Sequence, residues 1–90
     1  MNNLELLRIK KDIESNVGQR VRLKSNRGRR KIIEREGILE KTYPNIFVVR
    51  IDENTDSERR VSYSYTDVLT ETVEVTVFDK NGDIKIECVS

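Results

Sequence analysis

The abundance of β-branched side chains and the lack of alanine constrain this chain more than any motif does. Its 90 residues include ten Val and nine Ile but no Ala and no Trp. Side chains that branch at Cβ lose conformational freedom in a helix and pack well on a pleated sheet. Leu, Ile, Val and Phe supply 27 of the residues, which is enough for one modest core. We therefore expect one mainly β domain over residues 1–90.

The amino-terminal segment is the one stretch with a clear helical pattern. Its apolar residues recur at helical spacing, at Leu6, Ile9, Ile13 and Val17. Gly18 follows as a natural helix stop. The spacing predicts a helix over residues 1–18 with one apolar stripe, which we expect to pack on the rest of the domain.

From Gln19 onward the apolar residues recur at every second position, which is the period of a strand. The first such strand has a basic outer face, formed by Arg20, Arg22 and Lys24. Further strands are predicted at 30–43, 46–51 and 60–66, with an acidic loop at 52–58. The run 30–43 would span roughly 46 Å at strand rise, so it must bend, and we expect the bend at Gly37.

The carboxyl-terminal residues 79–90 are predicted to complete a hairpin. An Asn-Gly pair at 81–82 favours a two-residue turn between two runs of alternating apolar residues. The cross-strand pairs expected from this turn are Val77 with Ile86 and Val75 with Cys88. The turn and the apolar pattern agree, so we expect this register and a structural role for the thiol.

One helix followed by five to six curved strands suggests a small SH3-like or Sm-like barrel with an amino-terminal α-helix. In this arrangement residues 1–18 form the helix, 19–78 the barrel and 79–90 the last hairpin strand. An open, curved antiparallel sheet covered by the helix is the competing architecture.

The residue types argue against an enzyme. The chain has no His, which removes the usual base near neutral pH and the commonest metal ligand. Its single Cys, Cys88, alternates with apolar residues on a strand face, which is typical of an inert thiol. The carboxylates of the 52–58 loop lack the spacing of a calcium loop. We expect no catalytic residue, no metal site and no cofactor.

The same composition bears on location. A single Cys excludes an intrachain disulfide, and no apolar run approaches membrane-spanning length. Without a signal-like amino terminus, these features predict a cytoplasmic protein with no membrane partner. They leave the oligomeric state undetermined, with a dimer as one option.

The strongest charge feature is the segment from Arg20 to Arg35. It holds eight of the 17 basic residues against one acidic residue, although the net charge of the chain is only +1. Such segregation indicates an anion-facing or partner-facing surface. Gly28 permits a left-handed backbone, so that N–H groups and guanidinium groups can converge on one oxyanion. The candidate contact residues are Arg20, Arg22, Lys24, Arg27, Arg29, Arg30 and Lys31.

Three tyrosines are candidate aromatic contacts. Tyr43 lies in a predicted turn, whereas Tyr63 and Tyr65 share a predicted strand face with Val61. Exposed aromatic rings on small barrels can stack on nucleic acid bases. The apolar neighbour on the same face favours core packing for Tyr63 and Tyr65.

Three blocks of the sequence are distinctive. They are GRRKIIEREGIL at 28–39, TYPNIFV at 42–48 and ERRVSYSYTDVLTETV at 58–73. Together they resemble the Veg family of small bacterial proteins. The resemblance implies a Gram-positive cytoplasmic protein with a small SH3-like barrel, in a family associated with stimulating biofilm formation by acting against a transcriptional repressor. It implies no enzymatic activity.

From the charge pattern and the resemblance we expect a non-catalytic regulatory protein. It would promote biofilm formation by docking on a transcriptional regulator through the basic loop. The net charge near zero favours a protein partner, because dedicated nucleic-acid binders are usually strongly basic. Direct binding of DNA or RNA by a small barrel is the alternative.

Overall fold

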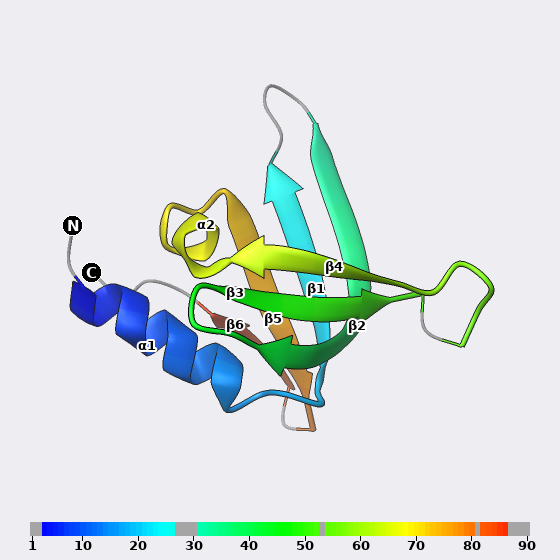
Figure 1. Cartoon of the computed structure of the whole chain (residues 1–90), viewed down its shortest axis with the longest axis horizontal. Helices are drawn as coiled ribbons and strands as arrows, with labels where there is room; N and C mark the ends of the chain where they lie inside the picture. The colour runs from blue at the N-terminus through cyan, green and yellow to red at the C-terminus, as the bar shows by residue number, and fades with distance from the viewer. Residues whose placement is uncertain (1–2, 27–30, 53, 81, 87–90) are drawn as a thin grey trace.

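The computed structural model describes residues 3–26, 31–52, 54–80 and 82–86. Within these ranges six strands form one antiparallel sheet, in the order β4-β3-β2-β1-β5-β6, accompanied by two short helices (Figure 1). In chain order the elements are α1 (Asn3–Glu14), β1 (Arg20–Asn26), β2 (Ile32–Thr42), β3 (Ile46–Ile51), β4 (Arg59–Ser64), α2 (Tyr65–Leu69), β5 (Val73–Asp79) and β6 (Gly82–Ile86). The mainly β class predicted from composition is confirmed.

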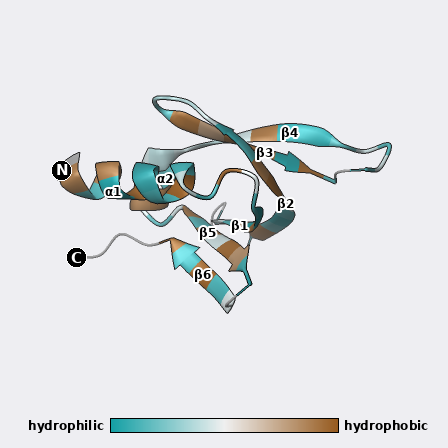
Figure 2. Ribbon diagram, turned by 90° about the horizontal axis from the view of Figure 1, so that it is seen from below, coloured by the Kyte–Doolittle hydropathy of each residue, from teal (hydrophilic) through white to brown (hydrophobic). Residues whose placement is uncertain are grey.

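The sheet is curved but stays open. β4 and β6 are its edges, and no pairing joins these two strands within the described residues. The predicted SH3-like or Sm-like barrel is therefore not confirmed, and the arrangement corresponds to the competing open sheet. α1 and α2 lie side by side at one end of the sheet (Figure 2). Neither helix in the described part of the chain is long and apolar enough to cross a membrane.

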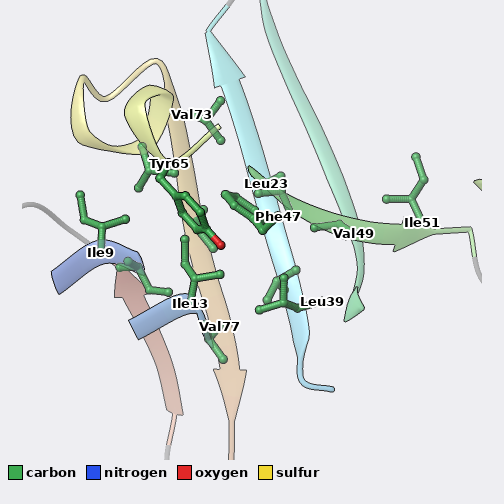
Figure 3. Close-up of a cluster of buried hydrophobic side chains, with 14 residues drawn as sticks. Ile9, Ile13, Leu23, Leu39, Phe47, Val49, Ile51, Tyr65, Val73 and Val77 are labelled. Atoms are coloured by element: carbon green, nitrogen blue, oxygen red, sulfur yellow. The ribbon is translucent and has the colours of Figure 1, made fainter. Parts of the chain in front are cut away.

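One face of the sheet, called here the inner face, carries the core. Alternate side chains of each strand point to it, because the side-chain period of a strand is two. Figure 3 shows Phe47 of β3 in the middle of this cluster, among residues from both helices and several strands. The buried side chains are Ile9, Ile13, Val21, Leu23, Leu39, Phe47, Val49, Ile51, Tyr65, Val68, Val73, Val75, Val77 and Ile86.

α1 ends at Glu14, earlier than the predicted residue 18. Ser15 Oγ and Asn16 Nδ2 both donate to the carbonyl oxygen of Asp12, at 2.9 and 2.7 Å. Such local side-chain bonds compete with continuation of the helix. The predicted stripe therefore does not extend to Val17, which is 45% exposed.

β2 changes partners along its length. It pairs with β1 over residues 32–38, but with β3 only from Gly37 onward. A Cβ added at Gly37 would collide with the carbonyl oxygen of Arg50, so the glycine permits a close approach of the β2 and β3 backbones. The ladder shifts register further along, between Leu39 and Lys41.

β4 ends two residues before the predicted end at Thr66, and the short helix α2 follows it. Ser64 has an extended backbone, and its Oγ accepts a hydrogen bond from Thr66 N at 3.1 Å. This is an N-cap, which satisfies a backbone donor at the start of a helix. Because the strand stops there, Tyr65 leaves the sheet and is buried in the core.

The β5–β6 hairpin has the predicted faces but a different register. Asp79 pairs with Gly82, two positions away from the expected arrangement. The observed pairs are Val77 with Ile84 and Val75 with Ile86. Gly82 has φ +122° and begins β6 instead of lying inside the turn. A shift of two leaves the apolar face unchanged. The predicted turn residue Asn81 and the thiol of Cys88 lie outside the described residues.

The close approach at Gly37 makes this glycine sensitive to substitution. Gly37→Ala is expected to lower the free energy of unfolding by about 1–3 kcal/mol, because the methyl group meets backbone that has no room to move aside. Gly18→Ala is the comparison: the space around Gly18 is open, and only its φ of +94° opposes a side chain, at about 1 kcal/mol. Urea unfolding measures both, and an equal or smaller cost at Gly37 would contradict the close approach.

Tyr65 ties α2 to the β2–β3 turn. Its hydroxyl donates to the carbonyl oxygen of Tyr43 at 3.0 Å, so Tyr65→Phe should lower the free energy of unfolding by about 1 kcal/mol at neutral pH.

The same hydroxyl makes stability depend on pH. Burial, and secondarily the charge of Glu14, raises the pKa of the Tyr65 phenol above its usual value. The folded state then keeps a proton that the unfolded state loses, so stability falls as the pH rises above about 10. Unfolding measured at pH 7 and 11 should show a smaller alkaline loss in Tyr65→Phe; equal losses would contradict this.

Candidate functional site

The outer face of β1 carries three of the predicted contact residues beside carboxylates. β1 and β2 pair so that Arg22 lies opposite Glu36 and Lys24 opposite Glu34. Arg20 Nε and Arg22 Nε are 3.8 and 3.9 Å from Glu36, and Lys24 Nζ is 3.9 Å from Glu34. The predicted basic outer face of this strand is therefore a surface of alternating charge.

The neighbouring strand on the other side of β1 continues this mixture. Glu74 of β5 lies opposite Lys24 and pairs with Lys85 of β6 at 3.2 Å. Arg22 also lies over the ring of Phe78, 5.1 Å from its centroid. Ion pairs this exposed contribute about 0–1 kcal/mol each, so the cations can exchange their carboxylate for one on a partner.

The remaining predicted cations belong to the connection between β1 and β2. Lys31 is exposed and lies immediately before β2. Arg27, Arg29 and Arg30 lie outside the described residues, so their role as contacts stays a prediction. Asn26 and Ile32, which flank this connection at the end of the β1–β2 hairpin, are cross-strand partners. We call residues 27–31 the basic segment.

The three tyrosines lie in different environments. Tyr65 is 2% exposed, so its ring is a core residue and is not available to stack on a partner. Tyr63 is half-buried and stacks on Phe47, with ring centroids 5.7 Å apart. Tyr43 is 42% exposed, and Lys41 Nζ lies 5.3 Å from its ring centroid. Of the three, Tyr43 presents the most open ring.

One feature that the sequence does not predict is a cavity of about 480 Å³ on the inner face. It lies between the edge strand β4, the far half of the β1–β2 hairpin, α2 and the start of β5. Figure 1 shows the hairpin extending past β4 at this point. We call this cavity the β4 groove; its lining includes Ile33, Arg35, Val61, Tyr63, Asp67 and Val73.

Arg35 is the basic residue of the groove, and the predicted contact residues did not include it. Glu34 and Glu36 point to the outer face, so strand alternation turns Arg35 to the inner face, opposite Leu23. Within the described ranges its guanidinium makes no hydrogen bond or ion pair. It also borders a second cavity of about 750 Å³ that reaches Arg59. The alternation Glu34-Arg35-Glu36 in the sequence could have indicated that Arg35 lies on the opposite face from its two acidic neighbours. A count of charges over the whole segment does not show this.

The backbone of β4 has one unpaired side along the groove. Tyr43 N donates to Ile46 O at 2.8 Å, and Tyr65 N donates to Asn45 O at 3.5 Å. The backbone N–H and C=O groups of even-numbered residues in β3 therefore point to β2, and those of odd-numbered residues point to β4. Because hydrogen-bonding direction alternates along an antiparallel ladder, the N–H and C=O groups of Arg60 and Ser62 in β4 point to the open edge.

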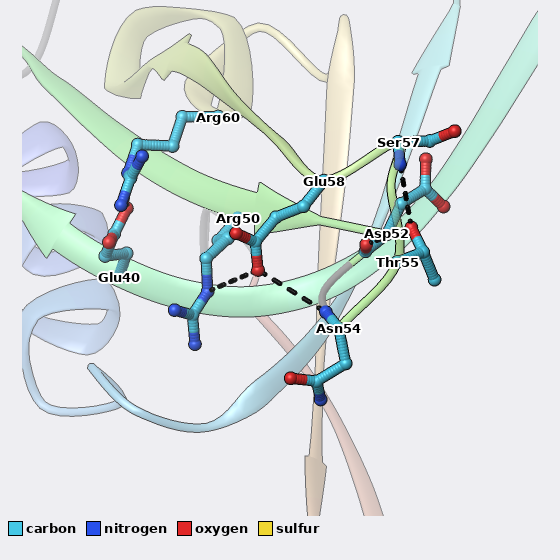
Figure 4. Close-up of polar contacts among 8 residues, drawn as sticks. All are labelled: Glu40, Arg50, Asp52, Asn54, Thr55, Ser57, Glu58 and Arg60. Atoms are coloured by element: carbon cyan, nitrogen blue, oxygen red, sulfur yellow. Dashed lines mark hydrogen bonds and ion pairs between the residues drawn. The ribbon is translucent and has the colours of Figure 1, made fainter.

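Polar contacts on the outer face hold the start of β4 (Figure 4). Arg60 Nε donates to Glu40 Oε2 at 2.6 Å, and this hydrogen bond lowers the pKa of the Glu40 carboxyl. Glu58 lies 3.8 Å from Arg50 Nε and accepts from Asn54 N at 3.4 Å. These contacts leave the open edge of β4 uncovered while fixing the strand to β2 and β3.

No group of His, Cys, Asp and Glu within the described residues is arranged to hold a metal ion. Among the described residues, the groove presents one cation, one carboxylate, several hydroxyl groups and an apolar floor.

Comparison with known proteins identifies the family. A family model described as "Biofilm formation stimulator VEG" matches residues 4–76. The chain belongs to the Veg family. The match covers α1, β1 to β4, α2 and the first part of β5, so both the β4 groove and the basic segment of this Veg protein lie inside it. The description names no enzymatic activity. A search of curated proteins found no match.

The cap on α2 holds one wall of the β4 groove in this Veg protein. Ser64→Ala is expected to lower the free energy of unfolding by about 1 kcal/mol, because it removes the acceptor for Thr66 N. Ser62→Ala on the same strand is the matched control, since Ser62 is exposed and caps nothing. Urea unfolding compares them, and equal costs would show that the cap does not stabilise the fold.

Proposed function

We propose that this protein is a non-catalytic regulator that stimulates biofilm formation by docking on a protein partner, a transcriptional regulator. The basic segment at the end of the β1–β2 hairpin is the primary contact in this proposal. The family assignment supports the biofilm role, since its description is that of a biofilm formation stimulator.

The observation that favours a protein partner is the ion pairing on β1. Arg20, Arg22 and Lys24 would extend the basic segment into a continuous cationic track if they stood alone. Instead, Glu34 and Glu36 lie between them on the neighbouring strand. A surface with both positive and negative charges complements a protein partner, which also carries charges of both signs. The carboxylates of such a surface repel a phosphate backbone.

Biofilm complementation tests this function directly. The protein is expressed in a biofilm-forming bacterium whose own Veg-family gene has been deleted, and biofilm mass is measured. Wild type should restore biofilm, and a variant with Arg29→Ala, Arg30→Ala and Lys31→Ala should not. The control is Arg8→Ala, Lys10→Ala and Lys11→Ala on α1, which removes the same charge from another surface and should restore biofilm normally.

Binding to duplex DNA separates the two partner classes. Fluorescence anisotropy with a labelled duplex is measured at about 50 and 200 mM salt. Wild type should show no binding whose affinity falls steeply as the salt concentration rises. Tight binding at low salt that the basic-segment variant loses, together with its biofilm activity, would replace the protein partner with nucleic acid. Full biofilm restoration by that variant would overturn the basic segment as the contact.

A further inference from the structure

We infer that the β4 groove binds an extended peptide segment of the partner protein, which adds a strand to β4 and places an acidic side chain on Arg35. The inference rests on the proposed function, because it specifies the part of the protein partner that is recognised. It adds a second site to the basic segment, along the far half of the same hairpin.

The edge of β4 supplies the main-chain part of this recognition. The N–H and C=O groups of Arg60 and Ser62 point away from β3, and no described strand pairs with them. An added strand satisfies such groups in the same way as a neighbouring strand of the sheet. The groove leaves room for it, since the cavity of about 480 Å³ lies along this edge.

The walls of the groove determine which side chains the added strand carries. Alternate residues of that strand point to the inner face, where Ile33, Val61 and Val73 form an apolar surface. Arg35 shares the same inner face of β2 with Ile33, two residues along the strand. The preferred segment therefore carries an apolar residue and an acidic residue on the same face, separated by an even number of positions.

The charges that line the groove favour a peptide carboxylate beside Arg35, at the end of the groove nearest the hairpin. Arg35 lacks a carboxylate within the described residues, whereas Glu34 and Glu36 are engaged on the opposite face. Asp67 of α2 lines the other wall and repels an anion there. A segment with one acidic side chain is thus oriented with that side chain towards the hairpin.

A nucleic acid fits this groove poorly. A single strand needs a cationic track and open aromatic faces. In the described part of the chain, the groove is lined by one cation, one anion and the ring of Tyr63, whose face is stacked on Phe47. Its apolar walls and open strand edge correspond to the needs of a peptide.

A displayed library of random peptides tests this occupant without a known partner. The peptides have about eight residues, enough to pair with the six residues of β4. Selection on the wild-type protein should enrich an acidic residue that is an even number of positions from a β-branched or aromatic residue. Recovery of basic or unpatterned peptides alone, or of none, would overturn the inference.

Variants then locate the binding of a selected peptide, synthesised with a fluorescent label. Arg35→Gln should weaken its affinity by about tenfold or more, because a charge-assisted contact is lost. Ser62→Pro should weaken it as well, since proline removes the edge donor without removing a bond to β3. Arg8→Gln on α1 is the matched charge control and should bind normally. Unchanged binding by both groove variants would overturn the inference.

Amide hydrogen exchange provides a readout that does not depend on variants. In the free protein the amides of Arg60 and Ser62 should exchange rapidly, and the peptide should slow them while the amides of Val61 and Tyr63 stay slow throughout. Slow exchange of Arg60 and Ser62 without peptide, caused by pairing between two copies, would assign this edge to a dimer and overturn the inference.

The biofilm assay separates this inference from the proposed function. If Arg35→Gln and Ser62→Pro restore biofilm while the basic-segment variant does not, the regulatory role stands and the groove is not its docking site. If wild type fails to restore biofilm but the selected peptide binds as described, the groove stands as a peptide site and the regulatory proposal fails.

Discussion

The rest of the structure depends on the division of β2 between two partners. Its first half pairs only with β1, and from Gly37 onward it pairs with β3 as well. The backbones can approach this closely because Gly37 has no side chain to collide with Arg50. Where β3 separates from β2, the β1–β2 hairpin extends beyond the core and β4 is left as an edge. The groove is the space between them.

The same pairing sorts the charges. Antiparallel register brings Glu34 and Glu36 beside the cations of β1, and weak ion pairs form across the outer face. Arg35, between these two acids, is turned to the other face and has no such partner within the described residues. The outer surface that the charge count indicates to be basic is therefore balanced, and Arg35 lies apart from it on the inner face.

The candidate site was only partly accessible from sequence. Cross-strand neighbours decide whether Arg20, Arg22 and Lys24 form a bare basic face, and those neighbours lie ten or more residues away in the chain. Burial of Tyr65 follows from the Ser64 cap, a local signal that the alternation of the preceding strand obscured. The groove itself is formed by β4, α2, β5 and the hairpin together, so no single stretch of sequence contains it.

The sequence by itself determined the local features: the β-rich class, the apolar stripe at Ile9 and Ile13, the faces of the strands and the family. These follow from side-chain branching and from a period of two or 3.6, which neighbouring residues define. Tertiary structure alone decided the register of the last hairpin, the open edge of β4 and the isolation of Arg35. Adjacent registers offer nearly the same backbone hydrogen bonds, so only packing between distant segments selects among them.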